Sequence, residues 1–207
     1  MKVRRSNFKY APYNWNELVQ VLQAYTHKYK VTQVLWKFPE MGWIKCNTDG
    51  ASRGNPGRSS WGFCVRNNTG DIIHAQAEEI EGAYSTNTQA EVMAILQALR
   101  FIKHTQRDQV LIETDSLLLV KVIHKIWEVP WQIVNEMEEI WEIMATRSIS
   151  VNHILREGNK MADYLANLAL DNGSVLVSSF QQLEREGRRL LNNDKLQLPY
   201  LRRRICT

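Results

Sequence analysis

The chain is poor in cysteine and has no long apolar run. Its 207 residues include three cysteines, an odd number, and their wide separation fits no zinc-binding motif. This usage indicates a reducing compartment, and we expect an intracellular protein, of the nucleus or the cytoplasm. No apolar run approaches the roughly 18 residues of a membrane span, so we expect no membrane partner. The basic start, MKVRRSNFKYAPYNW, precedes no apolar stretch, and we expect no secretory signal.

Internal repeats and low-complexity tracts are also absent from the sequence. Hydrophobic residues make up 44% and charged residues 23% of the chain, close to globular averages, which excludes a wholly disordered protein. A chain of this length can bury a core without disulfides or a structural metal. We therefore expect one domain of ordinary size with appendages.

The net charge of +4 conceals a division along the chain. Residues 1–45 carry 8 basic and 2 acidic side chains, residues 46–171 carry 11 and 17, and residues 172–207 carry 7 and 3. An acidic middle therefore lies between two basic flanks. Two interpretations stay open: solvated ends around an ordinary acidic domain, or a carboxylate-rich metal site whose basic arms contact a polyanion. The flanks could equally be remnants of a larger polyprotein.

The middle of the chain has the pattern of an α/β domain. Alternating and β-branched residues separated by turns predict three strands in an antiparallel meander, followed by strands that alternate with amphipathic helices. We expect strands at 43–50, 61–67, 71–80, 110–115 and 148–155, and helices at 86–104, 116–127, 131–145 and 160–172. This order predicts a mixed sheet with helices on its faces.

Weaker patterns lie on either side of this domain. Residues 16–29 form an amphipathic segment, and residues 178–191 predict one more helix before the basic run Arg202–Arg204. We therefore divide the chain into three parts: an N-terminal basic extension at 1–41, a central domain at 42–172, and a C-terminal basic tail at 173–207.

Four carboxylates stand where predicted strands end or predicted helices begin. Asp49 and Asp115 end strands, whereas Glu91 and Asp163 lie in the first turns of helices, on their apolar sides. Strand ends and helix starts often meet at one edge of an α/β sheet, where such folds place their sites. Each carboxylate alone would be a solvated cap, but four that converge would repel one another without cations. Oxygen ligands suit Mg²⁺ or Mn²⁺, and two such ions about 4 Å apart promote phosphodiester hydrolysis.

Four motifs resemble ribonuclease H of the type 1 family, in the family's order. They are TDGASRGNPG at 48–57, STNTQAEVMAILQAL at 85–99, ETDS at 113–116 and HILREGNKMADYLA at 153–166. The likeness covers about residues 42–172 and is strongest to the ribonuclease-H-like domain of plant non-LTR retrotransposons and their domesticated derivatives. It implies an α/β, ribonuclease-H-like fold, with a five-stranded mixed sheet of three antiparallel strands and parallel additions, flanked by helices.

The resemblance also implies an activity. It implies that four carboxylates are catalytic and bind the metal, Mg²⁺ with Mn²⁺ as the alternative: Asp49, Glu91, Asp115 and Asp163. The implied reaction is two-metal, endonucleolytic hydrolysis of the RNA strand of RNA–DNA hybrids by a monomer, leaving 3′-hydroxyl and 5′-phosphate ends. His153 matches the family's catalytic-loop histidine, which helps to move a proton or release product; the alternative is a buried strand-end histidine.

Substrate contacts are implied by the same resemblance. Asn55 and Asn87 match residues that contact the RNA strand, and Thr86 matches a residue that binds a phosphate of the DNA strand. Gly54 lets the backbone approach the substrate closely. Asn159 belongs to the same group, but Asn87 and Asn159 could also be plain helix caps.

Some positions depart from the family pattern. Tyr84 stands where the family often has an arginine, and the segment Lys125–Trp131 has one lysine where bacterial relatives have a lysine- and tryptophan-rich insertion. Trp127 and Trp141 lie among apolar neighbours, which favours core packing over base stacking. These departures keep a second hypothesis open, a catalytically silent nucleic-acid-binding module derived from a retrotransposon. An exonuclease of the wider superfamily is disfavoured, because Ala51 stands where those enzymes usually have an acidic residue.

Overall fold

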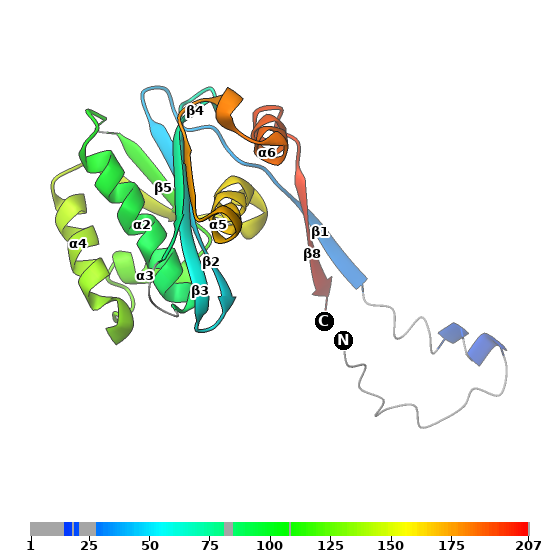
Figure 1. Cartoon of the computed structure of the whole chain (residues 1–207). Coiled ribbons are helices and arrows are strands. Elements are labelled where there is room, and N and C mark those ends of the chain that lie inside the picture. Colours follow the sequence, from blue (N-terminus) through cyan, green and yellow to red (C-terminus); the bar gives the residue numbers. More distant parts are fainter. Residues whose placement is uncertain (1–14, 18, 21–27, 81–84, 108, 207) are drawn as a thin grey trace. The chain divides into compact units, whose positions relative to one another are not determined.

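The computed structural model describes most of the chain (Figure 1). It leaves out residues 1–14, 18, 21–27, 81–84, 108 and 207, so Tyr84 and most of the predicted amphipathic segment 16–29 lie outside the described residues. Two compact units are present, one formed by residues 33–200 and the other by residues 1–32 together with 201–207. Within the described ranges, no helix has both the length and the apolar composition of a membrane span.

A mixed sheet forms the centre of the larger unit. Its strands lie in the order β6-β5-β2-β3-β4-β7. Their bounds are β2 Ile44–Gly54, β3 Gly57–Arg66, β4 Ile72–Glu79, β5 Val110–Thr114, β6 Ile149–His153 and β7 Ser174–Val177. Strands β2, β3 and β4 form the predicted antiparallel meander, and β5 and β6 add to β2 in parallel. The predicted α/β fold and mixed sheet are therefore confirmed.

The sheet has six strands, one more than predicted. The additional strand, β7, follows Gly173, whose φ of 83° ends the preceding helix in a left-handed turn. It pairs antiparallel with β4, where Val177 lies opposite Ala75. Its four residues are short for a recognisable alternation, so only the open edge of β4 explains why this segment becomes a strand.

Helices cover both faces of the sheet (Figure 1). On one face lie α2 Asn87–Lys103, α3 Leu117–Ile123 and α4 Val134–Ala145, and on the other lie α5 Lys160–Asn172 and α6 Arg185–Lys195. Alternate residues of a strand point to opposite faces, so Phe63 packs in the first core cluster and its neighbour Cys64 packs in the second. Helices therefore cover both faces of the central strands β2 and β3, whose residues are mostly buried, whereas β6 at the edge keeps exposed residues.

Two predicted helices are wrong in extent. The helix expected over 116–127 ends at Ile123, and Lys125 beyond it has a φ of 57°. As a result Trp127 is 51% exposed, contrary to the core position expected for it, whereas Trp141 on α4 is half-buried and donates to the carbonyl oxygen of Ile123. The helix expected over 178–191 is interrupted by an extended Leu183, which separates a short 3-10 turn from α6.

A glycine brings a helix into close contact with the sheet at the end of β2. A β-carbon at Gly50 would lie 2.3 Å from the backbone nitrogen of Glu91, so only glycine permits the observed approach of α2. At the start of α2 the hydroxyl of Thr86 accepts from the backbone nitrogen of Gln89, and the Gln89 side chain accepts from the backbone nitrogen of Thr86. This capping box fixes where the helix begins, and therefore where Glu91 lies.

A buried ion pair ties α6 to the sheet. The guanidinium of Arg66 on β3 donates to Asp194 at 2.6 Å, and both side chains are at most 2% exposed. The same guanidinium lies 3.6 Å from the ring centroid of Trp36 and donates to Asn47 Oδ1, which also accepts from Trp36 Nε1. Tyr200 donates a further hydrogen bond to Asp194. These contacts join segments outside 42–172 to the sheet, and we propose 33–200 as the unit that folds.

We expect Asp194→Asn to lower the free energy of unfolding by about 3 kcal/mol, because it leaves the Arg66 charge buried without its counter-ion. Asp71→Asn is the matched control, since Asp71 forms an exposed pair with Lys195, the residue next to Asp194, and should cost under about 1 kcal/mol. Urea unfolding monitored by tryptophan fluorescence measures both. Equal losses of unfolding free energy in the two variants would show that the buried Arg66–Asp194 pair stabilises the protein no more than an exposed pair does.

Candidate metal centre

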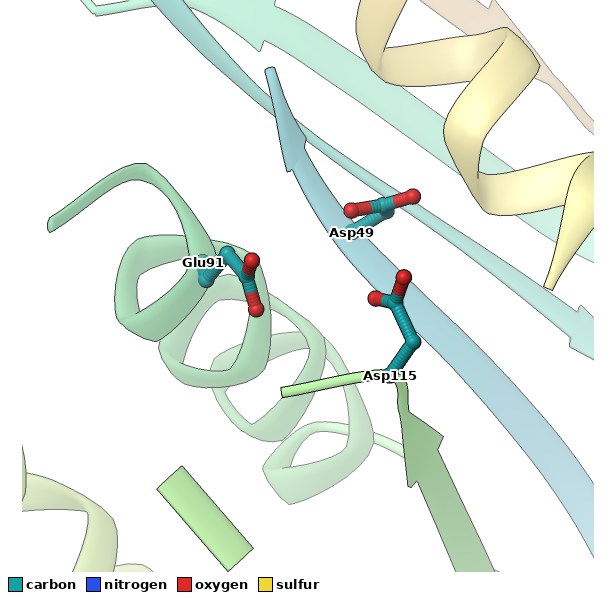
Figure 2. A group of neighbouring side chains, drawn as sticks. All are labelled: Asp49, Glu91 and Asp115. Carbon is teal, nitrogen blue, oxygen red and sulfur yellow. The ribbon is translucent and has the colours of Figure 1, made fainter. Parts of the chain in front are cut away.

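Three of the four predicted carboxylates lie together at one edge of the sheet (Figure 2). Ligand oxygens of Asp49, Glu91 and Asp115 all lie within 4.8 Å of one another. Strands β2 and β5 are parallel, and Thr48 pairs with Thr114, so the residues that follow, Asp49 and Asp115, emerge side by side. Glu91 reaches them from α2, which Gly50 admits to the end of β2. The adjacent strand ends and the close helix thus create the cluster.

Asp163 lies at the margin of this cluster. It is in the first turn of α5, its side chain is 25% exposed, and it is not one of the three residues that lie within 4.8 Å. Two cations face it, Arg156 at 3.7 Å and Lys160 at 3.8 Å. Its negative charge nevertheless adds to burial in raising the pKa values of Asp49 and Asp115. Asp163 therefore belongs to the same electrostatic site.

Burial and mutual repulsion make this cluster unusual for carboxylates. Burial, followed by the charges of Asp115 and Glu91, raises the pKa of Asp49 well above its ordinary value. Burial and the charge of Asp115 raise the pKa of Glu91 to about 7, and burial raises the pKa of Asp115. Among the described residues, no donor reaches Glu91 Oε2 or Asp115 Oδ1, although both atoms are buried.

Such a donor set fits a divalent cation. Buried anionic oxygens without hydrogen-bond donors are costly, and an ion of charge +2 would offset both the missing donors and the repulsion. Hard cations such as Mg²⁺ take oxygen ligands and commonly bind through a few carboxylates. Asp49, Glu91 and Asp115 therefore form a group that could hold a metal.

Asn159 is a buried residue next to the cluster. Its side chain is 1% exposed, and its Nδ2 donates to the carbonyl oxygen of Thr48 at 2.9 Å. The same side chain acts to lower the pKa of Asp115, against the larger effect of burial. Asn159 stands at the N-cap position of α5, but its side chain makes no capping bond. The alternative of a plain helix cap is therefore not what the structure shows. The amide instead ties the start of α5 to the end of β2, next to the cluster.

His153 lies at the same edge of the sheet. It is the last residue of β6, and its Cα pairs with Thr114, the residue before Asp115. Its side chain is exposed, so it is not the buried strand-end histidine that was the alternative interpretation. The imidazole is thus presented to solvent beside the carboxylates.

Four of the five residues predicted to contact substrate lie around the start of α2, whereas the fifth, Asn159, is buried at the start of α5. Asn55 Oδ1 accepts from the backbone nitrogen of Asn87 at 3.2 Å, and both side chains are exposed. Gly54, with a φ of 115°, ends β2 next to this pair. Thr86 is the N-cap of α2, so the capping role considered for Asn87 belongs to its neighbour. Asn87 keeps an exposed amide at this surface.

Arg156 is a residue of the site that sequence reasoning missed. It lies in the 3-10 turn Arg156–Gly158, is 72% exposed, and faces Asp163. Burial dominates the pKa values of Glu91 and Asp115 and raises both, whereas the charge of Arg156 opposes this shift. The only sequence signal was its position between His153 and Asp163 in the last motif.

The raised pKa values imply a stability that depends on pH. A carboxyl whose folded pKa exceeds its unfolded pKa contributes stability below the unfolded value, and this contribution is lost as pH rises towards the folded one. We therefore expect the metal-free protein to lose stability between about pH 4 and about pH 7. At pH 8 in EDTA, Glu91→Gln should exceed the parent in unfolding free energy by on the order of 1–3 kcal/mol.

Thermal unfolding at pH 4.5 and pH 8, chosen to bracket the shifted pKa of about 7, measures this effect. Glu138→Gln on the exposed side of α4 is the control and should leave stability unchanged at both values. If Glu91→Gln were no more stable than the parent at pH 8, repulsion within the cluster would not be a destabilising force.

Comparison with known proteins places this geometry in a family. Residues 47–169 match the model of the family described as reverse transcriptase-like. A protein of Arabidopsis thaliana that bears a provisional ribonuclease H name is 30% identical over 173 residues, 77% of this chain and 25% of that protein. A ribonuclease H of Chlorobium phaeobacteroides is 32% identical over 145 residues, 60% of this chain and 93% of that protein. The chain thus spans about a quarter of the length of its Arabidopsis relative.

Solved structures agree with the sequence matches. The ribonuclease H1 of Halobacterium salinarum superposes with a TM-score of 0.59 at 30% identity, over 63% of this chain and 98% of that one. LC11-RNase H1, crystallised in complex with an RNA/DNA hybrid, superposes with a TM-score of 0.58 at 29% identity, over 62% and 97%. The chain therefore belongs to the reverse transcriptase-like family and has the ribonuclease H fold.

Proposed function

We propose that this protein is a metal-dependent endonuclease that hydrolyses the RNA strand of RNA–DNA hybrids. The observation that carries the proposal is the cluster of Asp49, Glu91 and Asp115, with ligand oxygens within 4.8 Å and two buried oxygens that no described donor satisfies. The ribonuclease H relatives and the solved neighbour that contains a hybrid support this choice of reaction and substrate.

In this proposal the carboxylates hold two divalent ions, Mg²⁺ with Mn²⁺ as the alternative. Asp49 is the central ligand, because it is the most buried of the three clustered carboxylates and the charges of Asp115, Glu91 and Asp163 all act, after burial, to raise its pKa. When bound, such ions supply a nucleophile at neutral pH and stabilise the leaving oxygen of the phosphodiester. Asn159 holds the end of β2, and so the backbone next to Asp49, in place through its hydrogen bond to the carbonyl oxygen of Thr48.

His153 has the placement for proton transfer in this reaction. Its exposed imidazole lies one strand away from Asp115, where it can give a proton to the leaving 3′ oxygen or help to release the product. The role needs exposure and mobility, and a buried histidine would lack both. We therefore expect His153→Ala to lower the turnover number more than the affinity for hybrid.

The surface around the start of α2 is the proposed substrate contact. Hybrids differ from DNA by 2′-hydroxyl groups in a wide, shallow minor groove, which hydrogen-bonding side chains can reach. Asn55 and Asn87 offer exposed side-chain amides, and the backbone nitrogen of Asn87 donates to Asn55 Oδ1, which keeps the two residues together. Gly54 beside them carries no side chain to obstruct the approach. Thr86 would contact a phosphate of the DNA strand.

The decisive experiment is cleavage of a labelled RNA–DNA hybrid in the presence of Mg²⁺. We expect cleavage of the RNA strand only, and we expect Asp49→Asn to reduce its rate by a factor on the order of 10³ or more, because the central ligand is lost. Asp71→Asn, an exposed carboxylate in the turn before β4, is the control and should keep full activity. A rate that is the same for Asp49→Asn and the parent would refute the proposal.

Arg156 provides a test of the electrostatics. Its charge lowers the pKa values of Glu91 and Asp115 against the dominant effect of burial, so Arg156→Gln should raise both. Because a cation binds only the ionised cluster, the pH profile of Mn²⁺ binding should move to higher pH in this variant. Arg156→Lys should restore the parent profile, and isothermal titration across pH 5.5–8.5, on either side of the Glu91 pKa of about 7, measures all three proteins.

One observation favours the second candidate, a catalytically silent nucleic-acid-binding module. The single lysine of the segment 125–131 points at Trp141, with its Nζ 5.1 Å from the ring centroid, so this segment offers little positive charge to a substrate. Hybrid binding that depends on salt and is never followed by cleavage would support this candidate. Cleavage that requires metal would eliminate it.

A further inference from the structure

The two basic flanks of the chain meet in one small sheet. β1, Lys28–Val34, and β8, Tyr200–Cys206, are hydrogen-bonded as a separate two-stranded sheet, which we call the basic ribbon. Most of its residues belong to the smaller compact unit. The strands come from opposite ends of the sequence, and these are the segments that hold the chain's excess of positive charge.

The basic ribbon carries charge of one sign only. Its two seven-residue strands contain no acidic residue and five basic ones: Lys28, Lys30, Arg202, Arg203 and Arg204. The side chains of Lys30, Arg203 and Arg204 are exposed, and that of Arg202 is partly exposed. Pairing the strands therefore concentrates cations that the sequence holds about 170 positions apart.

The geometry of a strand distributes these cations over both faces. Successive side chains alternate, so Arg202 and Arg204 share one face and Arg203 takes the other. Residues two apart in a strand are separated by about 7 Å, comparable with the spacing of neighbouring phosphates along a nucleic-acid strand. A guanidinium also binds a phosphate with two parallel hydrogen bonds, and it keeps its charge at every physiological pH.

We propose that the basic ribbon is a docking arm for the phosphate backbone of nucleic acid. It supplies affinity that is independent of base sequence, and it takes no part in the chemistry at the carboxylates. The identity of the nucleic acid, an RNA–DNA hybrid, rests on the proposed function. The cationic ribbon compensates for the low positive charge of the segment 125–131, and it fits a polyanion because it has no acidic side chain to repel one.

The test measures binding of a labelled RNA–DNA hybrid by fluorescence anisotropy, with the full chain carrying Asp49→Asn to suppress cleavage. The ribbon variant replaces Arg202, Arg203 and Arg204 by glutamine. We expect its affinity at about 50 mM KCl to fall at least about tenfold. Between about 50 and 200 mM KCl, the slope of log K against log salt concentration should decrease in magnitude by about 2, because the phosphate contacts of Arg202 and Arg204, which share one face of the ribbon, are lost.

Two further proteins make the result specific. A charge-matched control replaces Arg107, Arg185 and Arg189, which are exposed on the larger unit, by glutamine and should bind almost as the parent does. A second ribbon variant, in which lysine replaces Arg202, Arg203 and Arg204, should keep most of the slope of log K against log salt concentration, because lysine keeps the positive charges. Equal losses in the ribbon variant and the charge-matched control, or no loss in the ribbon variant, would overturn the proposal.

A lipid surface is the competing partner for a basic ribbon with exposed Val31 and Leu201. Vesicles of anionic phospholipid bound by the parent and not by the ribbon variant, with hybrid affinity unchanged, would also overturn the proposal.

Cleavage by proteins that retain Asp49 separates this proposal from the proposed function. We expect the ribbon variant to keep its turnover number while its KM rises. Ribbon-dependent binding without any cleavage by the parent would refute only the nuclease, and cleavage with ribbon-independent binding would refute only the docking arm.

Discussion

The burial of three carboxylates close to one another is the constraint that the arrangement at this edge of the sheet has to satisfy. Asp49, Glu91 and Asp115 have ligand oxygens within 4.8 Å of one another, and burial with like charge raises their pKa values. No single strand or helix could hold three such groups together. The parallel register of β2 and β5 supplies two of them, and Gly50 admits the helix that supplies the third. The metal-free protein therefore disfavours the ionised form of the cluster, which is the form that would bind a cation.

The packing around the site keeps this arrangement rigid. Helices lie on both faces of the sheet, with α2, α3 and α4 on one side and α5 and α6 on the other. The capping box at Thr86 fixes the start of α2, and the buried Asn159 ties the start of α5 to the end of β2. The packed elements thus hold the carboxylates, whereas Asn55, Asn87 and His153, for which we propose roles toward substrate, are exposed.

The segments outside the family motifs have two distinct roles. Residues near 36 and 194 complete the larger unit, because Arg66 on the sheet places its buried charge against Trp36 and Asp194. The strands Lys28–Val34 and Tyr200–Cys206 instead pair as the basic ribbon. This division accounts for the uneven charge of the chain: the acidic middle holds the carboxylate cluster, and the positive excess lies partly in a separate element that the proposed docking function would use.

The sequence by itself determined the fold class and the order of most strands and helices, because these follow from local periodicity and turn residues. Its motifs predicted four carboxylates for the site, of which the structure brings Asp49, Glu91 and Asp115 together. It did not reveal the early end of α3 at Ile123, the sixth strand, the Arg66–Asp194 pair, the pairing of β1 with β8, or the place of Arg156 beside Asp163. Three of these features depend on groups that become available once the core has formed: the open edge of β4, the buried guanidinium of Arg66 and the anionic cluster. Only the tertiary structure decides them, since their energies come from contacts between residues far apart in the chain, which local patterns do not encode.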